Sequence, residues 1–539
     1  AKAGLASTVR QVLSGRKALI ILDGAEQADD LKAVLDLRST CGVLITSRKR
    51  DDALGFRLDL TPLEEQPAAE VFRLHSKGTA RCAPTTTDDA SVQGICKILD
   101  GWPVGLRIAG RYLGSTGESA ADYLQWLEKE PFKELGDGTH QEENAALLLR
   151  RSVAQVSDDA RLALGMAGCL AFAPIARKPV AYVLEGDERR ARKALSELVN
   201  YGLLEMKGER WQISHALVHT YARTELALST DALKRLAKLY MFFCYTVSKE
   251  GVQGYARLDA ERAHCLRLME SCLNSKLWEE VKLLVQAIYI YLDRQGWWTE
   301  QLAAWGMRLT AARKTGDRRD ESRCLNSLGF TCARRGEHDK ALSWNEQCLP
   351  INRELGDREG EGATLNNIGN VYRAQSKYEQ ALEYFEQSLS IWREVGYRKG
   401  EGTTLVSIGF LYDAQGDYEQ ALSYYEQALP LRRDAGDKIG EGTTLNFIGT
   451  IYRAQGKPAK ALGYHQQGLA IARQFGDRAG EALSCWNIGL TYEDFGDLAK
   501  AEEHISRAVQ IEEAIGHPDL ENDRKILEEV RAGRNKEKP

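Results

Sequence analysis

The stretch Leu365-Asn366-Asn367-Ile368-Gly369 belongs to a unit that recurs every forty residues in the C-terminal half of the chain. A glycine and an alanine keep this register from one unit to the next. They are Gly329, Gly369, Gly409, Gly449 and Gly489, and Ala341, Ala381, Ala421, Ala461 and Ala501. Because self-similarity at a fixed period is the signature of stacked repeats, it governs the choice of fold.

Each unit is predicted to form two helices. Leu365, Ile368, Gly369 and Tyr372 follow the i, i+3, i+4, i+7 spacing of one helix face. A Gly-Asp pair, such as Gly316-Asp317, separates the units, where glycine suits the end of one helix and aspartate caps the next. Since a single pair of helices cannot bury its own apolar face, the units are expected to stack into a solenoid from residue 316 onward.

This pattern resembles the tetratricopeptide repeat, with an Asn-Asn-Ile-Gly signature at residues 366–369. The resemblance implies a concave groove lined by the first helix of each pair. Amides there would bind a peptide backbone and arginines would bind its acidic groups, although polar residues on a solvated face are an alternative explanation. The residues expected in the groove are Asn326, Asn366, Asn370, Arg373, Asn446, Arg453 and Trp486.

Two apolar runs near the start of the chain predict buried parallel strands. The first covers residues 18–22 and ends at Asp23, and the second covers residues 42–46 and is followed by Ser47-Arg48. Ligands of α/β sheets bind at the carboxyl ends of such strands. Asp23 would hold Mg²⁺ through water and Arg48 would sense a terminal phosphate, whereas a loop-capping aspartate and a surface arginine are the alternatives.

Downstream, residues 157–221 read as a compact helical region that ends in a hairpin formed by residues 203–206 and 211–213. This is the outline of a winged helix. A basic cluster at Arg189, Arg190, Arg192 and Lys193 could suggest DNA binding, but Glu185, Asp187 and Glu188 offset it, which favours a solvated helix face.

Residues 18 to about 225 look like the NB-ARC class of STAND signal-transduction ATPases. The segment Leu19-Asp23 resembles their Walker B strand, Ile45-Arg48 their sensor strand, and Gly101-Leu106 their Gly-Leu-Pro-Leu-Ala-Leu motif. The resemblance implies bound ADP or ATP with Mg²⁺, Pro103 against the adenine, and His215 at the β-phosphate, although a lone histidine can also belong to the core.

The departures from that family matter. The sequence contains no G-x-x-x-x-G-K-[ST] motif, and Trp102 replaces a leucine. Without the P-loop amides and lysine, phosphates lose their main ligands. We therefore expect ATPase activity only in an intact protein that carries a P-loop and an output domain before Ala1, and weak or no nucleotide binding by this chain.

Composition agrees with an intracellular regulator. The net charge is −5, which favours neither nucleic acid nor a membrane surface, and the eleven cysteines include no CxxC pair. No membrane-spanning run or signal peptide is present, so a cytoplasmic protein is expected.

The predicted fold is mainly α. It comprises a partial α/β nucleotide-binding domain (1–60), a helical domain (61–140), a winged helix (141–228), a helical linker or degenerate repeats (229–315), and a tetratricopeptide solenoid with a capping helix (316–539). The predicted function is the ADP-locked switch and ligand sensor of a STAND ATPase, which a ligand in the groove would release for self-association. The alternatives are a repeat adaptor with a vestigial nucleotide domain and a winged-helix transcription regulator.

Overall fold

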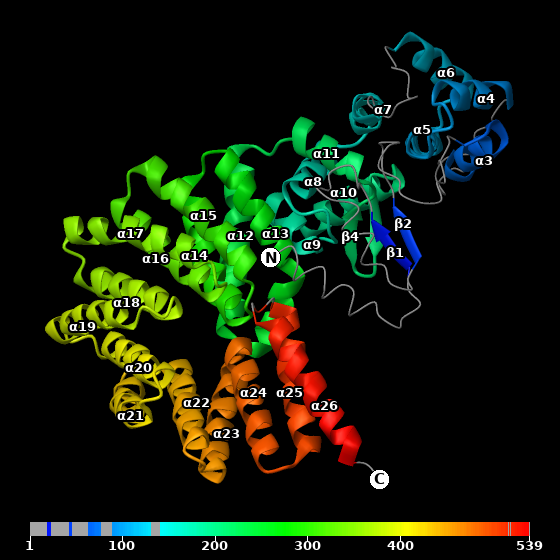
Figure 1. The fold of residues 1–539 in the computed structure, drawn as a ribbon. Helices are drawn as coiled ribbons and strands as arrows, with labels where there is room; N and C mark the ends of the chain where they lie inside the picture. Colours follow the sequence, from blue (N-terminus) through cyan, green and yellow to red (C-terminus); the bar gives the residue numbers. More distant parts are fainter. Residues whose placement is uncertain are drawn as a thin grey trace. The chain divides into compact units, whose positions relative to one another are not determined.

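The computed structural model describes residues 19–22, 42–45, 63–76, 89–130, 141–515, 517 and 519–537. As predicted, it is mainly helical (Figure 1). The chain divides into two compact units, Ala1–Leu236 and Ala237–Pro539. Within the described ranges, no helix is both long enough and apolar enough to cross a membrane.

The first unit begins with two strands, β1 (Leu19–Leu22) and β2 (Gly42–Ile45). They pair in parallel, with Leu19 opposite Gly42 and Leu22 opposite Ile45, which confirms the predicted strand pair. Asp23 and Arg48, the residues predicted to bind Mg²⁺ and phosphate, lie outside the described residues.

Four helices follow: α3 (Glu65–Ser76), α4 (Asp89–Ile98), α5 (Pro103–Thr116) and α6 (Ala120–Lys129). Their apolar faces bury Phe72, Ile95 and Leu106 completely. Helices α3 and α5 approach closely at Gly110, where a Cβ would lie 2.8 Å from the carbonyl oxygen of Phe72. A glycine is therefore needed for this helix contact.

The rest of this unit contains α7 (Gln141–Ala154), α8 (Asp158–Cys169), α9 (Arg177–Val183), α10 (Glu188–Asn200), β3 (Leu204–Lys207), β4 (Arg210–Ile213) and α11 (Ala216–Glu225). Strands β3 and β4 form the predicted antiparallel hairpin. Its turn contains Gly208, whose φ of 63° is a conformation that favours glycine. A bridge between Ile175 and Trp211 extends this small sheet.

The second unit is a continuous series of antiparallel helices (Figure 1). Helix α12 (Thr230–Lys249) crosses the boundary between the units. The others are α13 (Val252–Asn274), α14 (Trp278–Arg294), α15 (Trp298–Thr315), α16 (Arg318–Arg334), α17 (His338–Leu355), α18 (Arg358–Ala374), α19 (Tyr378–Val395), α20 (Arg398–Ala414), α21 (Tyr418–Asp434), α22 (Lys438–Ala454), α23 (Pro458–Phe475), α24 (Arg478–Asp494), α25 (Leu498–Ile515) and α26 (Leu520–Glu537).

The predicted five pairs are α16 to α25, and the described part of this unit contains no strand. Local chemistry sets the helix boundaries. The side chain of Asp357 accepts a hydrogen bond from the Gly360 amide at 2.9 Å, and Asp317 and Asp477 cap their helices in the same way. Tyr397, which stands where the other junctions have an aspartate, makes no such cap. An ion pair also recurs at each junction, as in Arg353–Glu361 at 2.8 Å and Arg433–Glu441 at 2.7 Å.

The recurring glycine lets the two helices of a pair pack closely. A Cβ at Gly369 would lie 2.6 Å from the ring of Phe385, and one at Gly409 would lie 2.7 Å from the ring of Tyr425. The large residue opposite the glycine varies between units and is buried in each. It is Asn345, Phe385, Tyr425, His465 and Ile505 in chain order.

The first helices of successive pairs pack against one another; these are α16, α18, α20, α22 and α24. The second helices of successive pairs make far fewer contacts with each other. The first helices therefore line the concave face of the array. The end of the array also contacts its beginning. Trp298, at the beginning of α15, packs with Ile511 and Ile515 at the end of α25, and a Cβ at Gly296 would lie 2.6 Å from Ile515.

Candidate ligand site on the concave face

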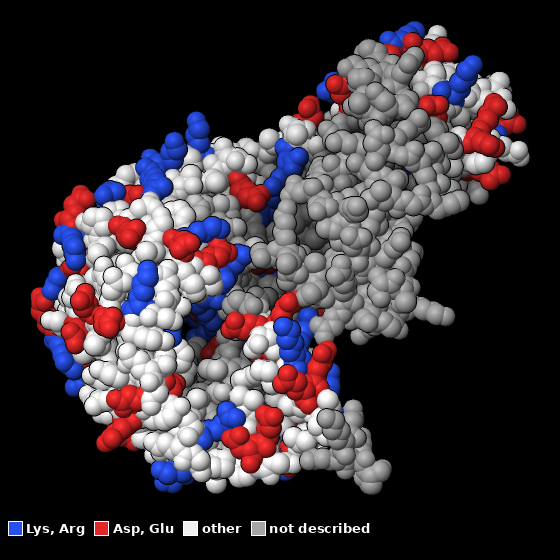
Figure 2. Space-filling view, in the orientation of Figure 1, with Lys and Arg blue, Asp and Glu red and all other residues white. Residues whose placement is uncertain are grey.

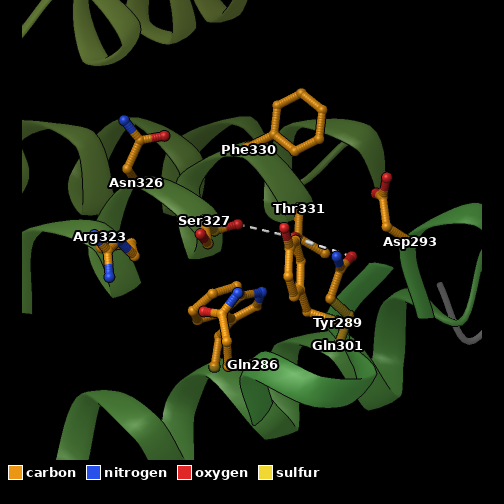
Figure 3. Close-up of a pocket in the computed structure, with 10 residues that line it drawn as sticks. Gln286, Tyr289, Asp293, Gln301, Arg323, Asn326, Ser327, Phe330 and Thr331 are labelled. Carbon is orange, nitrogen blue, oxygen red and sulfur yellow. Dashed lines mark hydrogen bonds between the residues drawn. The ribbon is translucent and has the colours of Figure 1, made fainter. Parts of the chain in front are cut away.

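A cavity of roughly 530 Å³ opens where α14, α15 and α16 meet, at the start of the array (Figure 3). Thr331 on α16 donates a hydrogen bond to Gln301 on α15 at 3.3 Å (Figure 3). The lining residues are Gln286, Tyr289 and Asp293 from α14, Gln301 and Trp305 from α15, and Arg323, Asn326, Ser327, Phe330 and Thr331 from α16.

The cavity lies where the repeat departs from its own pattern. Tyr289 stands forty residues before Gly329, the position that is glycine in all five later units. Its partner across the helix pair is Trp305, forty residues before Asn345, with ring centroids 6.0 Å apart. A bulky side chain in place of the glycine keeps these helices from the close packing of the later pairs, which explains the space.

Ion pairs hold the walls of this cavity in place. Arg308 donates to Asp320 from both Nε and Nη2, at 3.1 and 2.7 Å, and both side chains are buried. The same guanidinium donates to Gln286 at 2.9 Å. Because a buried arginine with a bidentate acidic partner has little rotational freedom, the position of Gln286 in the wall is fixed.

One cation in the wall is much less constrained. Among the described acidic residues, Arg323 reaches only Asp320, at 3.7 Å, and its side chain is 57% exposed. Phe330, two turns further on the same face of α16, is 44% exposed. Later units have the uncharged residues Ala363 and Thr403 at the position of Arg323, so a comparison of units could have found this arginine, which our sequence analysis missed.

Arg373 is a second weakly constrained cation, and it has no acidic partner in the described part of the chain. Its guanidinium lies 4.1 Å from the ring of Phe410, and its Nε makes no hydrogen bond to any residue that the structure describes. Burial lowers its pKa from the usual value. The buried hydroxyl of Tyr425 nearby also lacks a partner within these ranges, and burial raises the pKa of Asp413 on the next first helix.

Arg453 occupies the same register as Arg373 but is neutralised. Its Nε and Nη2 donate to the two carboxylate oxygens of Asp494 at 2.6 and 3.0 Å. The residue that corresponds to Asp494 in the unit of Arg373 is Ala414. The structure therefore distinguishes two arginines that the sequence register made equivalent.

In the first unit, the segment that resembles a nucleotide-binding motif lies near the predicted histidine. Pro103 is the first residue of α5 and is exposed. His215 caps α11, and its Nδ1 accepts a hydrogen bond from the Leu217 amide at 3.1 Å. Arg107, one turn after Pro103, donates to the carbonyl of Ser214 at 3.2 Å. Burial and the charge of Arg107 lower the pKa of His215.

The model of the tetratricopeptide repeat family matches residues 360–434 and 440–514. These units are tetratricopeptide repeats. Over 99% of this chain and 72% of that one, the fold is similar to a crystal structure of a STAND protein with a tetratricopeptide repeat sensor from Pyrococcus horikoshii, at 15% identity and a TM-score of 0.58. The chain thus has the fold of a STAND protein with C-terminal tetratricopeptide repeats.

Regulatory protein AfsR of Streptomyces coelicolor is 26% identical to this chain over 220 residues. The match covers 40% of this chain and 22% of AfsR. The chain therefore spans about a fifth of the length of that curated relative.

The asparagines predicted for the tetratricopeptide groove take part in contacts between repeats. Asn326 donates to Thr364 at 3.1 Å and accepts from Asn367 at 2.9 Å. Asn370 donates to the Asn366 carbonyl and to Ser407. Asn366 is buried, although its Oδ1 has no partner in the described residues.

Asn446 is also buried. It donates to Ser484 at 2.8 Å, and its Oδ1 lies 3.2 Å from Nδ1 of His465. Trp486 packs against apolar residues of α25. Both residues contribute to packing in the structure, so neither enters the ligand site that we propose.

The basic cluster on α10 is partly neutralised. Arg190 donates to both carboxylate oxygens of Asp159, at 2.9 and 2.6 Å. Both signs of charge are interspersed over the visible coloured face in Figure 2.

Proposed function

We propose that this chain is the switch and sensor part of a STAND-type regulatory ATPase, whose tetratricopeptide array binds a protein or peptide ligand. The observation that carries the proposal is the cavity of roughly 530 Å³ between α14, α15 and α16. Aromatic rings, amides and the exposed Arg323 line it, and this combination suits a peptide side chain together with its backbone.

The proposed ligand is an extended peptide with an acidic group. A second hollow of roughly 210 Å³ shares Asn326 and Phe330 with the cavity and continues toward α18 and α20. An elongated occupant fits two adjoining hollows better than a compact one does. Arg323 and the unpaired Arg373 lie on first helices of the array, and each would gain charge-assisted hydrogen bonds to a carboxylate.

Pro103 and His215 are the described residues that would hold ADP in an intact protein. Their elements meet at Arg107, which adds positive charge beside the amino end of α11. Helix amino termini favour phosphate groups, so this chemistry fits a nucleotide. Asp23 and Arg48 would bind Mg²⁺ and the terminal phosphate. A peptide that prefers the nucleotide-released arrangement would shift the population toward it and permit self-association.

The peptide proposal is tested by selecting ligands from a displayed random-peptide library on the immobilised full chain. The selected peptides are then titrated by fluorescence anisotropy against single alanine variants. We expect Arg323→Ala and Arg373→Ala each to weaken binding by about tenfold or more, because each removes a charged hydrogen-bond donor.

Arg453→Ala is the matched control. Its guanidinium already bonds Asp494, so its loss should change binding by less than about twofold. Failure to select any peptide, or equal losses at Arg453 and Arg373, would contradict a ligand site of this kind. Unchanged unfolding curves for the three variants would show that the effect is on binding.

A further inference from the structure

Three ligand-type side chains converge at the C-terminal end of the array, far in sequence from the proposed peptide site. They are Glu512 on α25, His517 between the last two helices, and Asp523 on α26. One ligand atom from each lies within 4.8 Å of the others. Nitrogen and carboxylate oxygen are the donor types that Zn²⁺ takes from proteins, at roughly 2.0–2.2 Å.

The burial of these groups sets them apart from a surface acidic cluster. Glu512 is 5% exposed and Asp523 is 9% exposed. The Oε2 atom of Glu512 has no hydrogen-bond partner among residues that the structure describes. A buried polar atom without a partner is unusual and calls for an explanation.

The neighbouring cation does not neutralise this pair. Arg524 follows Asp523 directly, but its guanidinium bonds Glu513 at 2.8 Å. Two carboxylates held close together in a buried place repel one another unless a proton or a cation lies between them. The imidazole of His517 beside them supplies a neutral third donor, which a divalent ion can use.

We propose that Glu512, His517 and Asp523 form a site for a divalent metal ion of the zinc type. The ion replaces the repulsion of the two carboxylates with three bonds to one centre, and water completes its coordination. This site is separate from the peptide site and does not depend on the function proposed above.

The site would also stabilise the contact that closes the array. It joins α25 to α26 through the segment that carries His517, and the His517 ring lies 5.8 Å from the ring of Trp298 at the start of α15. Trp298 in turn packs with Ile511 and Ile515 on α25. A metal that fixes His517 therefore stabilises the contact between the two ends of the array.

The test uses the full chain, stripped with a chelator, incubated with equimolar ZnCl₂ and passed over a desalting column. Bound zinc is counted by elemental mass spectrometry for the wild type, Glu512→Gln, His517→Ala and Glu503→Gln. Glu503 is an exposed acid on the same helix, so Glu503→Gln controls for the loss of one charge. We expect about one zinc per chain in the wild type and the control, and about tenfold less in the other two variants.

Zinc should also raise the Tm of the wild type and of Glu503→Gln by roughly 3 °C or more, because a ligand that binds only the folded state stabilises it. A Co²⁺-loaded sample should show no thiolate absorption, which separates this site from binding by cysteine. If Glu512→Gln fails to fold, the half-buried His517 variant decides the result alone. Equal zinc in wild type and His517→Ala, or no zinc in the wild type, would overturn the proposal.

Discussion

The side chain of Gln295 donates a hydrogen bond at 3.2 Å to the carbonyl of Gly476, 181 residues further along the chain. This bond joins the turn between α14 and α15 to the turn between α23 and α24. In an open solenoid each repeat contacts only its neighbours, and stability is roughly a sum of local terms. A contact between the ends adds a long-range term that couples the first repeats to the last.

Closure of the array predicts a coupled response to mutation. Trp298→Ala removes a ring that is 3% exposed and packs with Ile511 and Ile515. We expect a loss of about 3 kcal/mol in the free energy of unfolding, as for other buried aromatic truncations. Hydrogen exchange should accelerate in α25 as well as in α15. Leu283→Ala, at a 49% exposed site, is the control, and exchange confined to α15 would argue against closure.

Replacement of glycine by alanine is predicted to have opposite effects on stability at two positions. Gly369→Ala places a methyl group 2.6 Å from Phe385, so we expect a loss of about 1–3 kcal/mol. Gly463→Ala, on a helix surface with no atom within 4 Å of the new Cβ, should gain about 0.5–1 kcal/mol. Chemical denaturation measures both, and equal effects of the two changes would refute the packing role of Gly369.

His465 predicts a pH dependence of stability. Burial lowers its pKa from 6.5 to about 4. Protonation therefore favours the unfolded chain, so the stabilisation is complete above about pH 6.5 and is lost as the pH falls toward 4. The difference in pKa corresponds to on the order of 3 kcal/mol.

The comparison for His465 is His465→Phe, since phenylalanine occupies the same position at Phe385. Urea unfolding at about pH 7.5 and about pH 5 should show a smaller loss of stability in this variant than in the wild type. An identical loss in both proteins would assign the acid sensitivity to other groups.

Nucleotide affinity is predicted to be low in this chain. The sequence carries no G-x-x-x-x-G-K-[ST] motif, so the amides and lysine that cradle phosphates in related motifs are missing from it. Calorimetry with ADP should give no binding in the micromolar range. Micromolar affinity that is lost on His215→Ala would show instead that the residues near Arg107 suffice.

Local chemistry explains why much of the architecture could be predicted. The forty-residue period, the Gly-Asp boundaries and the i, i+3, i+4 spacing depend on contacts within a few residues, and each predicted helix pair is present. The apolar runs of β1 and β2 and the turn between β3 and β4 are also local signals, although β1 and β2 pair across 23 residues, with Leu19 opposite Gly42.

The sequence by itself determined the repeat, its helix boundaries and the small residues that let helices pack. The tertiary structure decided which charged side chains form ion pairs and which remain available to a ligand. Arg373 and Arg453 share a register, but of the two only Arg453 pairs with a described acid, Asp494, which the next repeat supplies. The closure at Trp298 likewise depends on angles between helices that accumulate along the array, which no local pattern encodes.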